Sequence, residues 1–437
     1  MKLNKEILAL AIPNIISNIS VPLISSVDTG LMGTLSALHL GAVALGSMIF
    51  NFVYWNFGFL RMGTTGMTAQ AYGKQDQATI IHTWGRALLV AFCLSMLILI
   101  FQVPIARLGF WLMNVSQEQH TLVSEYFFTR IWAAPATLLL VVMMGWFFGM
   151  QNAIYPLILT LIINASNIAV SYVLVAHYKL GVAGVAYGTV AAQYIGLFSA
   201  FALFAYQYKH LLQHLQRQIM LETQAFWGFL SINSDIFLRT LSLSLAFGFF
   251  YSQSAAAGKE ILAVNSILMQ FLNWMSFGVD GFAYAAESLV GKYKGANDRP
   301  MTNKAIRLSM FWGMGLGLLF SLVYGLLGTE LVHLFTDQSD VVAAALPYLW
   351  WMVLLPVIGT PCYIWDGVFV GLTAVKAMRN SMVVAMVVYF ACYWSLVYFY
   401  PNVSDLSNIL WTALLLFLAT RGLLQWWWFR QKGLDLS

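Results

Sequence analysis

The sequence predicts an all-α integral membrane protein with twelve transmembrane helices in two pseudo-symmetric six-helix lobes. The first observation is composition: of 437 residues, 60% are hydrophobic and only 9% are charged, whereas soluble domains carry roughly 25% charged residues. The second is a set of twelve long apolar runs, and the third is a weak internal repeat. A soluble fold of this size would need a charged surface that this chain does not supply.

Twelve apolar runs are long enough to cross a bilayer, because its ~30 Å hydrocarbon core requires about 20 helical residues. Runs such as 88–103 are apolar on every face, which predicts helices rather than the alternating strands of a β-barrel. The first run holds prolines, asparagines and an aspartate without a small-residue cleavage site, so we do not expect a cleavable signal peptide. The runs lie near 7–32, 41–69, 80–103, 122–149, 153–176, 181–207, 225–250, 261–290, 303–327, 342–372, 379–399 and 406–429.

The basic residues predict an orientation. With both termini in the cytosol, the inner loops and ends hold fifteen Lys and Arg residues, and the outer loops hold only Arg107, Lys179 and Lys259. Cytoplasmic loops of membrane proteins are enriched in Lys and Arg. We therefore expect a multi-pass protein of the cell (inner) membrane, surrounded by membrane lipids, with both termini cytosolic.

The longest inner connection divides the spans six and six. It predicts an N-terminal lobe at 1–207, a cytosolic inter-lobe linker at 208–224 and a C-terminal lobe at 225–437. Because six is an even number, two such lobes share one membrane orientation. Parallel repeats of this kind are typical of transporters, with a central cavity between the halves.

An offset of 222 residues relates the two halves. It joins three separated features, which a chance match would not easily produce. The matches are Gly73-x-x-Asp76 with Gly295-x-x-Asp298, Tyr126 with Tyr348, and Gly145-x-x-x-Gly149 with Gly367-x-x-x-Gly371.

Several kinds of chemistry lack their motifs. The sequence has no G-x-x-x-x-G-K-[ST] loop, no H-E-x-x-H and no G-x-G-x-x-G after a strand. Cys93, Cys362 and Cys392 are scattered through apolar segments and form neither a disulfide framework nor a metal-ligand spacing. The net charge of +5 is spread over short loops, so it does not indicate nucleic-acid binding. We expect no cofactor and no structural metal, and transport would have to draw on an ion gradient.

The first span carries a polar stripe that ends in a carboxylate. Inserting an ionisable group into a bilayer costs roughly 2.5–3.5 kcal/mol on insertion scales, so an aspartate within a span, such as Asp28, is expected to have a function. Pro13 and Pro22 interrupt backbone hydrogen bonding and allow this helix to bend. The stripe predicts a protonatable or cation-binding site, and the alternative is a helix-end carboxylate within reach of the outer interface. Its members, within about 80° of one another, are Asn14, Asn18, Ser25 and Asp28.

The fifth span carries a matching uncharged stripe of Asn164, Asn167 and Ser171, within about 60°. Carboxamide oxygens there would hydrogen-bond Asp28 or help to coordinate a cation. Ordinary hydrogen bonding between helices is the alternative.

The second half holds the remaining acids within spans. Asp235 and Arg239 are i, i+4 neighbours, which favours an internal ion pair. Asp280 and Asp366 either bind substrate cations or pair with Arg239 and Arg421. One face of the eighth span carries Asn273, Ser276, Asp280 and Glu287.

Several segments together resemble a known family. They are Val27-Asp28-Thr29-Gly30 with Pro13 and Pro22, Phe59–Gly66 with Ala69-Gln70, Gly145–Asn152 with Pro156, Asp280-Gly281 with Ala286-Glu287 and Gly291, and Asp366–Thr373. On these segments the chain resembles the multidrug and toxic compound extrusion (MATE) transporters, in the damage-inducible DinF-like branch.

The resemblance implies two six-helix lobes in a V-shaped molecule that exchanges H⁺ or Na⁺ for cationic or amphipathic toxicants. It places the family's first-helix coupling carboxylate at Asp28 and its fifth-helix Asn at Asn167. Many members carry Asp where this chain has Ser171, and 153–176 contains no acid. We therefore expect proton coupling through Asp28 alone, with Na⁺ at Asp28 as the alternative.

These observations predict a monomeric secondary active antiporter for drugs and toxic compounds. A flippase for lipid or lipid-linked substrates is the first alternative. A flippase cavity for anionic head groups should hold several unpaired Arg or Lys residues. In this chain the four intramembrane arginines are spread over four helices, and five acids also lie within the spans. An integral-membrane transferase, the second, would need clustered His or Asp, whereas the seven histidines lie mostly in loops; we expect no enzyme activity. The expected cavity residues are Asn14, Asn18, Ser25, Arg61, Asp235, Arg239, Asp280, Glu287 and Asp366.

Overall fold

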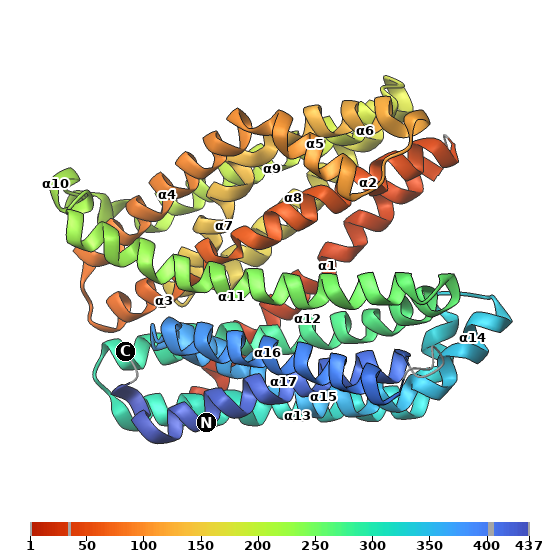
Figure 1. Ribbon diagram of the computed structural model, residues 1–437. Coiled ribbons are helices and arrows are strands. Elements are labelled where there is room, and N and C mark those ends of the chain that lie inside the picture. The colour runs from red at the N-terminus through yellow and green to blue at the C-terminus, as the bar shows by residue number, and fades with distance from the viewer. Residues whose placement is uncertain (1, 34–35, 401–405, 436–437) are drawn as a thin grey trace. The chain divides into compact units, whose positions relative to one another are not determined.

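The computed structural model shows α-helices joined by short turns, and the residues it describes contain no strand (Figure 1). It describes residues 2–33, 36–400 and 406–435, and side chains in 2–20, 36–400 and 406–434. In lipid, a helix satisfies its own backbone hydrogen bonds, which is why a chain of this composition folds into helices.

Within the described residues, the first half of the chain contains ten helices and four shorter helical turns. The helices are α1 (Lys2–Gly33), α2 (Ala37–Trp55), α3 (Phe59–Gly73), α4 (Gln77–Ile100), α5 (Gln102–Leu112), α6 (Gln117–Arg130), α7 (Ala134–Gly149), α8 (Ile154–Tyr172), α9 (Gly181–Tyr208) and α10 (Arg217–Met220). The turns are the 3₁₀ segments η1 (Asn56–Gly58), η2 (Ile131–Ala133) and η4 (Lys209–His214), and the π-helical η3 (Val173–His177).

In the second half, the part that the structure describes contains seven helices and short 3₁₀ turns. The helices are α11 (Thr223–Ala256), α12 (Lys259–Gly295), α13 (Arg299–His333), α14 (Ser339–Ala345), α15 (Leu349–Gly371), α16 (Val375–Phe399) and α17 (Leu406–Lys432). The turns are η5 (Leu346–Tyr348) and η7 (Gly433–Asp435).

Ten helical segments within the described residues are long and apolar enough to cross a membrane. Three of them join two helices through a 3₁₀ turn: α2 with α3, α6 with α7, and α14 with α15. The helices α1 and α11, of 32 and 34 residues, occupy the first and seventh predicted runs. The twelve segments follow the twelve apolar runs in order, so the predicted all-α membrane fold is confirmed.

Contacts divide the chain into two compact units. The C-terminal unit comprises Met1–Ile15 and Ser234–Ser437, and the N-terminal unit comprises Ile16–Asn233. The start of α1 belongs to the C-terminal unit because Glu6 accepts hydrogen bonds there from Lys292 (3.2 Å) and from the Tyr293 hydroxyl. The functional lobes at 1–207 and 225–437 stay a prediction.

The predicted linker is packed against α4 within the N-terminal unit. The guanidinium of Arg86 donates to the backbone carbonyls of Ile219 (2.7 Å) and Met220 (2.8 Å). One turn earlier, His82 Nε2 accepts a hydrogen bond from the backbone N–H of Gln216 (3.1 Å). These bonds hold η4 and α10 against the start of α4.

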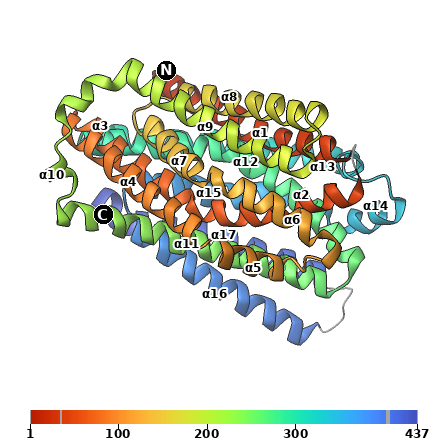
Figure 2. The ribbon, with the colours of Figure 1, turned by 90° about the horizontal axis from the view of Figure 1, so that it is seen from above.

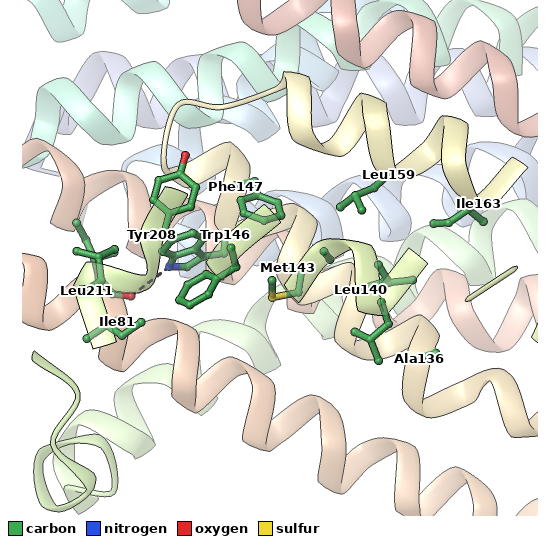
Figure 3. Close-up of a cluster of buried hydrophobic side chains, with 14 of the residues drawn as sticks. Ile81, Ala136, Leu140, Met143, Trp146, Phe147, Leu159, Ile163, Tyr208 and Leu211 are labelled. Atoms are coloured by element: carbon green, nitrogen blue, oxygen red, sulfur yellow. Dashed lines mark hydrogen bonds between the residues drawn. The ribbon is translucent and has the colours of Figure 1, made fainter. Parts of the chain in front are cut away.

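The core of the N-terminal unit lies between α4, α7, α8 and α9, which run side by side (Figures 2 and 3). Its centre is Trp146 of α7, which is fully buried and donates from its indole N–H to the carbonyl of Ile80 (3.3 Å). The rings of Phe147 and Tyr208 pack edge-on against it, with centroids 5.7 and 4.9 Å away. Edge-to-face packing of this kind stabilises aromatic clusters beyond simple burial.

The 222-residue repeat recurs in the turns. Asp76 and Asp298 are the N-caps of α4 and α13, and each carboxylate accepts the backbone N–H three residues later, at 2.9 and 3.0 Å. The residues before them, Gln75 and Asn297, both have positive φ, of 58° and 55°. Equivalent positions therefore adopt the same strained turn and the same cap.

The repeat also recurs in helix packing. A Cβ built at Gly145 of α7 would lie 2.5 Å from the carbonyl oxygen of Arg61 on α3. A Cβ built at Gly367 of α15 would lie 2.1 Å from the carbonyl oxygen of Ala283 on α12. Gly367 and Ala283 lie 222 positions after Gly145 and Arg61, respectively. The second glycine of each motif repeats this approach one turn further along. The prediction that both motifs allow close helix contact is confirmed.

Candidate functional site

The carboxylate predicted to couple transport lies on α1. The backbone of α1 is helical from Lys2 to Gly33, through both of its prolines. The side chains of Pro22, Ser25 and Asp28 lie outside those that the structure describes. At the start of the same stripe, Asn14 is buried and donates to a backbone carbonyl one turn earlier (2.8 Å).

The three polar residues of α8 face two neighbouring helices of the N-terminal unit. Asn164 Nδ2 donates to the backbone carbonyl of Ser20 on α1 (3.3 Å), so the α8 stripe contacts α1 directly. Asn167 Nδ2 donates to Thr189 Oγ1 on α9 (3.2 Å). Asn167 Oδ1 is buried and has no hydrogen-bond partner within the described part of the chain. A buried carbonyl oxygen in that state is a natural acceptor for a proton-bearing group or a cation.

The third member of the stripe, Ser171, is fully buried where α8 meets α9. A Cβ built at Gly188 would lie 2.1 Å from Ser171 Oγ. The two helices therefore touch at this point, and Ser171 Oγ finds no partner among the described residues. A longer side chain at position 171 that pointed toward Gly188 would require α8 and α9 to move apart.

The C-terminal unit contains a buried charged cluster around Asp366 of α15. Its carboxylate accepts hydrogen bonds from the guanidinium groups of Arg239 on α11 and Arg421 on α17. Gln425, one turn after Arg421, donates to the other carboxylate oxygen (2.7 Å). Asp366 is 4% exposed and Arg421 is fully buried. Of the two alternatives left open for Asp366, the geometry favours pairing with arginines.

A second ion pair corrects a prediction about partners. The helical spacing favoured a pair between Asp235 and Arg239, but the structure pairs Asp235 with Arg379 on α16. The guanidinium of Arg239 instead reaches the carboxylate of Asp366. A buried charge pairs with the oppositely charged group that lies nearest to it, which can be on another helix. The spacing of residues along one helix does not give the distance between helices.

Two residues of these clusters were missed by sequence reasoning. Arg379 stands at the first position of the predicted run 379–399, where a basic residue indicates only the end of a span, and Gln425 carries no charge that would mark it. Neither has a local spacing signal, because both contact α11 or α15 from other helices.

The remaining predicted cavity residues lie on α1, α3 and α12. Asn18, Arg61 and Asp280 are half-buried, and Glu287 is fully buried. The backbone of Arg61 and that of Glu287 both belong to glycine-mediated helix contacts, at Gly145 and at Gly371. Their positions are therefore fixed by packing as well as by any polar role.

Comparison with known sequences gives consistent matches over nearly the whole chain. A family model described as MatE matches residues 13–173 and 236–394. The DNA damage-inducible protein F of Escherichia coli (strain K12) is 37% identical over 424 residues, which cover 96% of this chain and 90% of that protein. A probable multidrug resistance protein NorM of Rhizobium meliloti (strain 1021) is 24% identical over 410 residues, with coverages of 89% and 85%.

Solved structures share the fold. A crystal structure of a MATE protein in a bent conformation has a TM-score of 0.87 at 19% identity and covers 99% of this chain and 95% of that chain. The Vibrio cholerae MATE transporter VcmN in its bent form has a TM-score of 0.84 at 17% identity, with coverages of 98% and 97%. At this level of identity the likeness shows the fold alone.

Proposed function

This chain belongs to the MatE family of membrane transporters, and from that premise we propose that it is a secondary active antiporter. It exports cationic or amphipathic drugs and toxic compounds in exchange for protons. It is a transporter and not an enzyme, because the family members that it matches are transporters.

The observation that supports this proposal is a contrast between two buried acids of the C-terminal unit and helix α8 of the N-terminal unit. In the C-terminal unit, Asp366 and Asp235 are both neutralised by arginines within salt-bridge distance. Neither offers an unneutralised carboxylate to a substrate cation or to a proton. In the N-terminal unit, α8 presents buried oxygen acceptors and no charged side chain, and Asn164 contacts α1.

Asp28 is accordingly the proposed coupling residue. α8 offers no basic side chain as a counter-ion, and the charge of a carboxylate without a fixed counter-ion is balanced by a proton or by a bound cation. Protonation and substrate binding then exclude each other, which is the condition for antiport. A ligand shifts a conformational equilibrium only by its differential affinity for the two states, and a change in charge on α1 supplies such a difference.

Protons are the proposed coupling ion, with Na⁺ as the alternative. A cation site of two carboxylates would need an acid on α8, and 153–176 contains none. The close contact of Ser171 with Gly188 supports this, because a longer side chain at position 171 could not extend toward Gly188 on α9.

The test is transport by purified protein in liposomes with an imposed ΔpH and no Na⁺ gradient, read with a fluorescent cationic dye. Wild type should move dye against its gradient, whereas Asp28→Asn should bind dye but lose ΔpH-driven transport. The matched control is Asp337→Asn, which makes the same change at an exposed loop position and should retain transport. Wild-type rates in Asp28→Asn, or transport that follows only a Na⁺ gradient, would contradict proton coupling through Asp28.

We also propose the cell (inner) membrane as the location, with both termini cytosolic. The turn at Asn297 and the turn at Gln338 are both exposed and lie at opposite ends of α13. In a variant without Cys93, a cysteine at Gln338 should react with an impermeant maleimide in sealed cells, and a cysteine at Asn297 should not. The reverse result would invert the orientation.

A further inference from the structure

Helices α13, α15 and α17 of the C-terminal unit surround a groove of about 1020 Å³. Its lining is mostly apolar and aromatic, with Met310 and Phe311 from α13, Pro361 from α15, and Ala419 and Leu423 from α17. Sites for drug-sized molecules measure about 300–1,000 Å³, so this groove lies at the upper limit of that range. None of its lining residues belongs to the coupling site or to the Asp366 cluster.

A second hollow of about 500 Å³ continues the groove toward the start of α13 and the end of α17. It is lined by basic side chains, including Arg430 and Lys432. The two hollows are continuous because they share Asn303, Trp365, Trp426 and Phe429.

Charge distinguishes the two ends of this composite groove. Arg299 and Arg307 approach from α13, and Arg430 and Lys432 approach from α17. No acidic side chain lines either hollow in the described ranges. The guanidinium of Arg430 lies over the ring of Trp426, 5.5 Å from its centroid. The groove is therefore apolar along the helices and strongly basic at its mouth.

We propose that this groove binds an anionic phospholipid, with acyl chains between α13, α15 and α17 and the phosphate at the basic mouth. A soluble anion would leave the apolar walls exposed, a neutral lipid would offer no anion to Arg307, Arg430 and Lys432, and an organic cation would be repelled by them. An anionic lipid satisfies both parts at once. Basic pockets at the cytoplasmic ends of helices bind such head groups, and the run Trp426–Trp428 places the mouth at an interface.

The test is native mass spectrometry of purified protein with equal amounts of phosphatidylglycerol and phosphatidylcholine that carry identical chains. Each basic residue near an anionic lipid contributes a factor of about five. Wild type should retain phosphatidylglycerol in preference, and Arg307→Glu should lower the ratio of the two bound lipids at least about fivefold. The matched control is Lys304→Glu, which reverses an exposed charge one turn away that does not line the groove and should leave the ratio unchanged.

A second pair of variants tests the apolar part. Ala419→Phe places a ring in the groove and should reduce retention of phosphatidylglycerol, whereas Thr420→Phe at the neighbouring position outside it should not. Unfolding temperatures of all variants establish that they are folded. Equal retention of both lipids by wild type, or equal behaviour of Arg307→Glu and Lys304→Glu, would overturn the proposal. So would displacement of the lipid by glycerol phosphate, which indicates a soluble-anion site, or by the cationic dye, which indicates a substrate site.

Discussion

Replacing Gly367 by alanine tests whether the backbone contact between α15 and α12 is a structural necessity. The new Cβ would lie 2.1 Å from the carbonyl oxygen of Ala283. Non-bonded heavy atoms rest at about 3.5–4.0 Å, so the helices would have to separate by roughly 1 Å or more. Overpacking of this kind costs about 1–3 kcal/mol, and we expect Gly367→Ala to lower the free energy of unfolding by that amount.

Gly315 of α13 provides the matched control. A Cβ built there meets nothing within 4 Å, and alanine is favoured over glycine within a helix by roughly 0.5–1 kcal/mol. Gly315→Ala should therefore be neutral or stabilising, opposite in sign to Gly367→Ala. The assay is unfolding of both purified variants in mild detergent with increasing sodium dodecyl sulfate, followed by tryptophan fluorescence.

The repeat extends the prediction to the N-terminal unit. Gly145→Ala should be destabilising too, because its Cβ would lie 2.5 Å from the carbonyl oxygen of Arg61. Gly228→Ala, where a Cβ has open space, is its control. If Gly367→Ala and Gly145→Ala were as stable as their controls, the close contacts would not constrain the helices and the reasoning would be refuted.

Three further perturbations address other parts of the structure. Arg421→Met leaves the buried carboxylate of Asp366 with one arginine instead of two, and should lower the free energy of unfolding by about 1.5–3 kcal/mol in the same assay; an unchanged midpoint would contradict a tightly coupled cluster. Arg86→Met removes two hydrogen bonds to the linker and should speed trypsin cleavage at the exposed Arg217, whereas an unchanged rate would mean that other contacts hold the linker. Asp76→Ala removes the N-cap of α4 and should lower stability by about 1 kcal/mol at neutral pH. Partial burial raises the pKa of the Asp76 carboxyl, but hydrogen bonds from the first turn of α4 outweigh burial and hold that pKa below its ordinary value. The advantage of wild type should therefore be complete above the unfolded-state pKa of about 4 and disappear as the pH falls through the folded-state pKa; a difference independent of pH would contradict the cap.

The fold was predictable because a bilayer imposes a length and a composition on each span. About 20 apolar residues per helix are visible without any knowledge of packing, and all twelve runs correspond to long helices. The repeat was predictable for a similar reason. Gly145 and Gly367 must be glycine because two backbones touch there, and this requirement appears in the sequence as two Gly-x-x-x-Gly motifs that are 222 residues apart.

The ion pairs were not predictable in the same way. Asp235 and Arg239 are neighbours on one helix, but their partners lie on α16 and α15. A pair between helices depends on which faces pack together, and no local spacing encodes that choice. Gln425 was missed because an uncharged amide gives no signal until its carboxylate partner, Asp366, is placed beside it.

The assignment of the first part of α1 was also beyond sequence reasoning. Glu6 belongs to the C-terminal unit through Lys292, nearly 300 positions later. Contacts at that separation arise from the fold, and hydropathy does not report them.

Proton release on substrate binding tests the central claim, that a carboxylate on α1 binds either a proton or the substrate, most directly. Thermodynamic linkage requires that a substrate which lowers the proton affinity must release protons when it binds. When a cationic dye is added to purified protein in weakly buffered detergent solution, the account predicts acidification by wild type and by Asp337→Asn. It predicts none by Asp28→Asn, although that variant still binds the dye. Proton release by Asp28→Asn equal to that of wild type, or dye binding by wild type without any release, would contradict the account.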